Sequence, residues 1–233
     1  MKLHFFGADK EVTGSCHQLE VGGKKLLIDC GLQQGGDELD DNALPFAAGE
    51  IDYVLITHAH IDHSGRLPLL VKNGFKGPVI ATRLTCDLLR IMLMDSARIQ
   101  EMDAQWKTQK LSRAGADPVE PLYTVEDTQA ALELLRPCEY RQEVPLFDGV
   151  QATFIDAGHL LGSASILVTA RESGLTRTIA FSGDIGNTDQ PIIRDPDYIT
   201  QADYVLMDST YRNRLHEAGG YTVEELGREE GHE

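Results

Sequence analysis

Short runs of alternating hydrophobic and polar residues fill the start of the chain, and this pattern predicts β-strands. The predicted strands cover residues 2–7, 12–21 and 24–28, and a more uniformly apolar run at 51–56 ends at Thr57. A further strand is predicted at 78–81, and several more between residues 141 and 208. The chain is therefore predicted to be rich in β-structure.

Three other segments have the patterning of helices. They cover residues 64–73, which Gly74 closes, residues 85–107, and a segment that starts at the capping pair Thr124 and Asp127 and reaches residue 135 before Pro137. Between the last two, residues 111–122 are predicted to form a loop that borders the functional site. Together these elements predict an α/β fold with two sheets inside and helices outside.

Length and charge narrow the class of protein. A chain of 233 residues is long enough for one core, and one domain is the expectation. The formal net charge of −16 is unusual for a nucleic-acid binder, because affinity for a polyanion normally comes from Lys and Arg. RNA or another single-stranded nucleic acid is therefore a candidate partner that the net charge does not favour. No run is long and uncharged enough to cross a membrane.

The cysteines indicate the compartment. Cys16, Cys30, Cys86 and Cys138 are widely spaced and include no Cys-x-x-Cys pair, and the start of the chain has no signal-type apolar segment. We expect buried, reduced thiols in a cytoplasmic protein.

The densest chemistry in the chain follows the strand that ends at Thr57. His58, His60, Asp62 and His63 fall within six residues, in the kind of loop where functional sites are usually placed. His58 and His60 can face one ion while Asp62 and His63 face a second. Imidazole and carboxylate together suit zinc best, with manganese or iron as alternatives. A solvated polar loop is the competing interpretation, but four ligand-type residues rarely collect by chance.

Two later segments repeat this arrangement of a ligand-type residue beyond an apolar strand. One ends in Gly158-His159 and the other in Ser182-Gly183-Asp184. Together with the first cluster they predict a site with three histidines, His58, His60 and His159. A second site would hold Asp62, His63 and Asp184, whose carboxylate could bridge two ions.

These motifs, in this order and spacing, resemble the metallo-β-lactamase fold superfamily. Four further segments resemble its β-CASP branch, which contains ribonuclease J and the nuclease that cleaves messenger-RNA 3′ ends: residues 6–17 (Phe-Gly-Ala to Ser-Cys-His), 27–31 (Leu-Ile-Asp-Cys-Gly), 158–164 and 208–211 (Asp-Ser-Thr-Tyr). The resemblance implies an αββα sandwich, a supporting role for the Asp29 carboxylate at the metal ligands, and a catalytic role for Asp208.

The chain also departs from the β-CASP pattern. Residues 1–210 are expected to form the metallo-β-lactamase domain, and residues 211–233 the start of a β-CASP-like insertion or an acidic tail. The final segment of the fold is expected to be missing, together with a further histidine of the second metal site, which would leave that site weak. Neither His216 nor His232 is a convincing replacement ligand.

The expected reaction is hydrolysis by a metal-activated water, with Asp62 as a ligand that also orients this water. The favoured function is a zinc phosphodiesterase or ribonuclease for RNA processing, with two ions expected. The alternatives are a hydrolase of small esters, lactones or phosphoesters, and an inactive metal-binding fragment. A homodimer that covers the open edge of a sheet is also considered.

Overall fold

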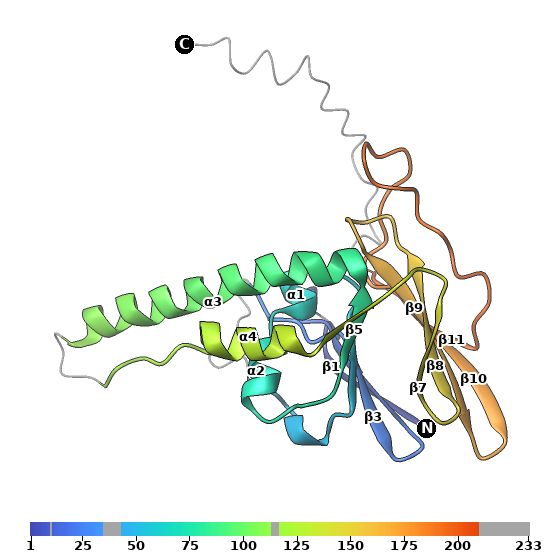
Figure 1. The fold of residues 1–233 in the computed structure, drawn as a ribbon, viewed down its shortest axis with the longest axis horizontal. Helices are drawn as coiled ribbons and strands as arrows, with labels where there is room; N and C mark the ends of the chain where they lie inside the picture. The colour runs from blue at the N-terminus through green and yellow to red at the C-terminus, as the bar shows by residue number, and fades with distance from the viewer. Residues whose placement is uncertain (10, 35–42, 113–116, 210–233) are drawn as a thin grey trace, which may run out of the picture.

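The computed structural model describes residues 1–9, 11–34, 43–112 and 117–209. Two β-sheets pack face to face, and the helices lie against the outer face of the first sheet (Figure 1). The first sheet has the order β1-β2-β3-β4-β5-β6. Its strands are β1 (Lys2–Gly7), β2 (Cys16–Val21), β3 (Lys24–Ile28), β4 (Tyr53–Leu55), β5 (Val79–Thr82) and β6 (Leu135–Cys138).

The second sheet has the order β11-β10-β9-β8-β7. Its strands are β7 (Glu143–Phe147), β8 (Val150–Asp156), β9 (Ala164–Glu172), β10 (Leu175–Phe181) and β11 (Tyr204–Leu206). The four strands β3 to β6 run parallel to one another, and β10 runs parallel to β11. The remaining neighbours are antiparallel.

Successive side chains of a β-strand point to opposite faces of the sheet, and this alternation divides the core into two layers. On β3, Leu26 and Ile28 enter the cluster between the sheets, whereas Leu27 enters the cluster between the first sheet and the helices. A strand buried on both faces in this way reads as a continuous apolar run. The run at 51–56 in the sequence has the same explanation.

The helices are η1 (Ala48–Glu50), α1 (Ile61–Ser64), α2 (Leu67–Lys72), α3 (Arg83–Ser112) and α4 (Val125–Glu133). The capping box predicted at Thr124 and Asp127 is present at the start of α4. The helix predicted over 64–73 is α2, which begins three residues later than expected, and Ser64 instead ends the separate helix α1. Pro68 lies in the first turn of α2, where a residue without an N–H is tolerated, and the new helix therefore begins at Leu67.

One strand prediction and one helix prediction need correction. The strand predicted over 12–21 begins only at Cys16, because Gly14 has a φ of +81° and turns the chain. The helix predicted to reach residue 135 ends before Pro137 as expected, but already at Glu133, and Leu135–Cys138 form strand β6, which the sequence did not predict. This strand lies at the edge of the first sheet, where proline is accepted because one side of the strand needs no hydrogen-bond donor.

The α/β metallo-β-lactamase fold predicted from the sequence is confirmed. The described residues supply three of the four layers of an αββα sandwich, since no helix among them covers the outer face of the second sheet. Residues 211–233, His216 and His232 lie outside the described residues.

The loop predicted to border the site lies elsewhere. Helix α3 has 30 residues, which carry the chain about 45 Å from the end of β5 at 1.5 Å per residue. Val119 then exchanges two hydrogen bonds with Thr108 near the far end of α3. Among the described residues of 111–122, none lines the cleft at the strand ends. None of the helices in the described part of the chain is long and apolar enough to cross a membrane.

Candidate metal centre

The candidate ligands converge because parallel strands bring their carboxyl ends to one edge. Asp29 follows β3 directly, and the segment from Thr57 to His63 follows the neighbouring strand β4. On the second sheet, Asp184 lies shortly after β10 and Asp208 shortly after the parallel strand β11. This edge is where sheets of this kind usually bind ligands.

Three histidines face one another in the first group of ligand atoms. His58 Nε2 lies 3.0 Å from His60 Nδ1, and His159 Nε2 lies 3.3 Å from the same atom. With a carboxylate oxygen of Asp184, these nitrogens all lie within 4.8 Å of one another. Burial lowers the pKa of both His58 and His159, and it holds these rings in the neutral form that binds a cation.

The tautomer of His58 follows from its neighbour. Thr57 Oγ1 donates to the Asp29 carboxylate, at 2.9 Å to Oδ2, and lies 3.0 Å from His58 Nδ1. The Thr57 hydroxyl has one proton, and it donates this proton to Asp29. The Thr57 oxygen therefore accepts a hydrogen bond from His58 Nδ1. The lone pair of His58 Nε2 then points toward His60 and His159, as a metal ligand requires.

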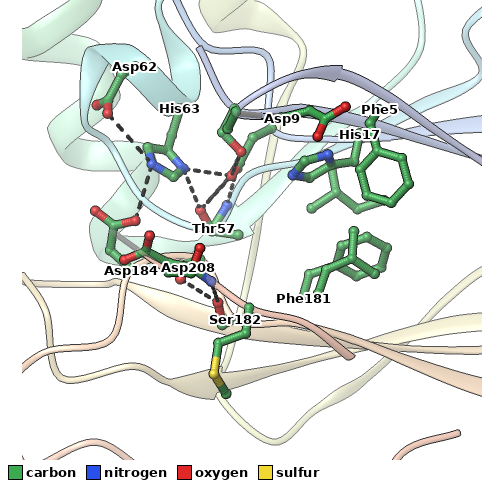
Figure 2. Close-up of a pocket in the computed structure, with 18 of the residues that line it drawn as sticks. Phe5, Asp9, His17, Thr57, Asp62, His63, Phe181, Ser182, Asp184 and Asp208 are labelled. Atoms are coloured by element: carbon green, nitrogen blue, oxygen red, sulfur yellow. Dashed lines mark hydrogen bonds and ion pairs between the residues drawn. The ribbon is translucent and has the colours of Figure 1, made fainter. Parts of the chain in front are cut away.

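The second group contains Asp62, His63 and the other oxygen of Asp184 (Figure 2). His63 Nε2 lies 3.3 Å from Asp184 Oδ1 and 3.8 Å from Asp62 Oδ2. Asp184 Oδ2 instead faces the histidines of the first group, at 3.5 Å from His159 Nε2 and 3.8 Å from His58 Nε2. The two oxygens of Asp184 therefore point to different groups, as expected of a bridging carboxylate.

The electrostatics of this group are those of a cation site. Burial opposes charge on His63, but the carboxylates of Asp29 and Asp184 outweigh it and raise the pKa of His63 to about 10. Burial also opposes charge on Asp184, yet the hydrogen bond and charge of His63 hold the pKa of this carboxyl group well below its usual range. The Nε2 atom of His63 faces the carboxylates of Asp62 and Asp184. A metal cation bound there would take the place of the Nε2 proton, and these three residues therefore fit a cation.

Asp29 supports both groups from beneath. It is 1% exposed and accepts hydrogen bonds from Thr57 N at 2.8 Å and Ser15 Oγ at 3.2 Å. Its second oxygen lies 2.7 Å from His63 Nδ1, which fixes the ring of His63 with Nε2 directed at Asp184. The backbone of Asp29 has a φ of +61°, a conformation that aspartate tolerates better than most residues.

A tight turn between β8 and β9 places His159. Ser163 Oγ accepts hydrogen bonds from His159 N at 3.0 Å and Leu160 N at 3.2 Å. From β5 and the start of α3, the buried hydroxyls of Thr82 and Thr85 donate to Gly162 O at 2.6 and 2.7 Å. The turn is therefore fixed from both sides.

Gly162 and Ser163 therefore serve the turn itself, since Ser163 is fully buried and its hydroxyl accepts a hydrogen bond from His159 N. The roles of Thr82 and Thr85 were missed. No local signal links them to a turn about 80 residues away, although their spacing of three residues at a helix start is typical of a cap.

A cleft of about 580 Å³ opens beside the second group. Asp62, His63, Asp184 and Asp208 line it, and Asp208 lies next to Asp184 in Figure 2. The backbone N–H of Asp208 donates to Ser182 Oγ at 3.0 Å, which ties the end of β11 to the end of β10. The sequence did not predict the rest of the lining, which includes Phe5, Asp9, Glu11, His17 and Phe181.

The four cysteines are free and buried, as the sequence predicts. Burial raises the pKa of Cys86 to about 11 and that of Cys138 to about 12. None of the four belongs to the group of ligand atoms described above.

Comparison with known proteins identifies the family. The family description "Metallo-beta-lactamase superfamily domain" matches residues 18–182. A ribonuclease of Thermus thermophilus is 40% identical over 227 residues, which are 97% of this chain and 47% of the relative. The cleavage and polyadenylation specificity factor 73 of Drosophila melanogaster is 32% identical over 223 residues, which are 93% of this chain and 30% of the relative.

The chain thus spans less than half the length of these relatives. A solved structure of a B3 metallo-β-lactamase with an active-site glutamic acid aligns with a TM-score of 0.46 and 20% identity, over 77% of this chain and 59% of the other. The relatives confirm the resemblance to the β-CASP branch. With a match that covers most of the chain, and with a fold and ligand groups that agree with it, the protein belongs to the metallo-β-lactamase superfamily.

Proposed function

We propose that this chain carries the metal centre of a metal-dependent phosphodiesterase that acts as a ribonuclease. One observation supports this most strongly: the two oxygens of Asp184 face two separate groups of ligand atoms. The first group would hold one ion through His58, His60 and His159. Asp62, His63 and Asp184 would hold a second.

The donor atoms favour zinc as the resident metal, with manganese or iron as alternatives. Two bound ions would supply Lewis acidity, which lowers the pKa of water and offsets charge on phosphoryl oxygens. Asp62 opens onto the cleft with a 23% exposed side chain, where its carboxylate can orient a water and accept its proton. Asp208 opens onto the same cleft and can exchange a proton with the departing oxygen.

RNA is the proposed substrate because of the relatives' names, a ribonuclease and a cleavage factor. A second candidate is a hydrolase of small esters, lactones or phosphoesters. The lining of the cleft favours it, since six carboxylates and no Lys or Arg are found among the lining residues, and a polyanion would gain little there without metal.

The test combines metal content with two substrates. Metal per chain is measured on purified wild type, His60→Ala and the control His4→Ala, whose side chain lies on β1, is 42% exposed and does not line the cleft. Each protein is then assayed with bis(p-nitrophenyl) phosphate and with a labelled RNA. We expect about two ions in the wild type and the control, and loss of metal and of both activities in His60→Ala.

The outcomes separate the proposals. Cleavage of the small diester without cleavage of RNA would select the small-substrate hydrolase. Full activity of His60→Ala would refute the assigned metal centre. A wild type that binds metal and hydrolyses neither substrate would identify an inactive metal-binding fragment.

A further inference from the structure

Helix α3 has an apolar face that it does not use in the described fold. Its buried side chains point toward the first sheet and α4: Thr85, Cys86, Leu89, Leu93, Ala97 and Ala104. Successive side chains of an α-helix are about 100° apart around its axis. By this measure, five exposed hydrophobic residues lie on the side of α3 opposite to the buried residues. This outer stripe consists of Leu84, Ile91, Ile99, Met102 and Trp106, which are 46–67% exposed.

The outer stripe is too long to be ordinary surface. From Leu84 to Trp106 it extends about 33 Å along the helix axis, and it includes a tryptophan 61% exposed. Single exposed hydrophobic residues are normal, but five along one side of a helix mark a contact surface, here with the charged residues Asp95 and Arg98 between Ile91 and Met102. In Figure 1, α3 runs along the border of the molecule, and its far end extends past α4.

Its spacing is that of a helix that pairs with another helix. Three residues of the stripe, Leu84, Ile91 and Met102, lie on the four-and-three positions of a heptad that also includes 95, 98, 105 and 109. Ile99 and Trp106 each follow such a position by one residue and lie beside this seam. Two of the heptad positions carry opposite charges, Asp95 and Arg98. Both side chains are exposed, and within the described residues neither has an ion-pair partner.

We propose that the outer stripe binds the outer stripe of a second copy of this chain, with the two α3 helices antiparallel. When Ile91 lies opposite Met102 of the second copy, the same register places Asp95 opposite Arg98. By the two-fold symmetry this ion pair occurs twice at the centre of the contact. Such a contact is self-complementary, as closed dimers require.

A parallel arrangement lacks this complementarity. It would place Asp95 opposite Asp95 and Arg98 opposite Arg98, and like charges in contact oppose association. The charges therefore select the antiparallel register. No residue of α3 lines the cleft of the metal centre, so the dimer would leave the cleft open and does not depend on the proposed function.

Sedimentation velocity on the full chain at low ionic strength tests the proposal. The wild type is compared with Asp95→Arg and Arg98→Asp, each of which places like charges opposite one another in the homodimer. The matched controls are Asp103→Arg and Arg90→Asp, exposed positions on α3 beside the stripe that change the net charge equally. We expect a wild-type dimer, unchanged controls, and association at least about tenfold weaker in each single variant.

A mixture of the two variants gives the decisive result. One Asp95→Arg chain and one Arg98→Asp chain together restore both ion pairs, so the mixture should form a one-to-one heterodimer. Thermal melting under monomeric conditions checks that all variants are folded. A wild type that stays monomeric at about 100 μM, single variants that dimerise like wild type, or a mixture that stays monomeric would each overturn the proposal.

Discussion

Replacement of Gly162 by alanine should unfold the turn that carries His159, whereas the same change at Gly174 should cost much less. The two glycines have nearly equal backbone conformations, with φ of +86° and +80°. An alanine Cβ at Gly162 would lie 2.4 Å from Thr85 N, but at Gly174 it meets no atom within 4 Å. A comparison of Gly162→Ala with Gly174→Ala therefore separates the cost of the steric contact from the cost of backbone strain.

The magnitude follows from two contributions. Positive φ costs an alanine about 1–2 kcal/mol, and this applies equally at both positions. At Gly162 the turn must also move away from the start of α3, which breaks the hydrogen bonds from Thr82 and Thr85 to Gly162 O at about 1 kcal/mol each. We expect about 3–4 kcal/mol for Gly162→Ala and about 1–2 kcal/mol for Gly174→Ala.

Urea denaturation of metal-free protein measures both free energies of unfolding. Metal content gives a second measurement, since displacement of the turn moves the His159 ring away from His58 and His60. Gly162→Ala should lose metal at a chelator concentration that Gly174→Ala withstands. Equal destabilisation of the two variants would refute the argument that contact with α3 holds the turn.

Two further predictions concern Asp29 and the thiols. Asp29→Asn keeps the size of the side chain but removes the charge that orients His63. Metal affinity should therefore fall about 10- to 100-fold in a competition assay with a chromophoric chelator. Unchanged affinity would show that His63 needs no such support. Because burial disfavours the thiolates of Cys86 and Cys138, native protein at pH 8 should not react with an aromatic disulfide reagent. Unfolded protein should release one equivalent of the aromatic thiolate for each of its four cysteines. Fast labelling of the cysteines in the native state would contradict the described burial.

The ligand groups could be predicted from the sequence because each follows an apolar strand. Strand ends that carry ligand-type residues meet only if the strands are parallel, and β3 with β4, and β10 with β11, satisfy this condition. The sequence could not reveal how Asp184 divides its two oxygens between the groups, because that depends on the distance between the sheets.

Other features depend on tertiary contacts that leave no local trace. Pro137 is a helix stop in most contexts, and it belongs to a strand here only because β6 is at a sheet edge. Thr82 lies between the predicted strand and the predicted helix, which starts at Thr85, and the bonds of both residues to Gly162 depend on the packing of one sheet against the other. Local pattern predicted the elements well and their mutual contacts poorly.

The net charge of −16 looks adverse to a phosphodiester substrate, but its distribution changes this conclusion. Asp9, Glu11, Asp62, Asp184 and Asp208 all line one cleft, and two of them belong to the ligand groups. Two divalent cations would offset most of this local charge and leave a centre that attracts the scissile phosphate. Because no Lys or Arg lines the cleft, the proposed RNA substrate would gain its remaining affinity from surfaces outside this cleft. For the proposed ribonuclease, chemistry at one phosphate and affinity for a polymer would therefore be separate properties.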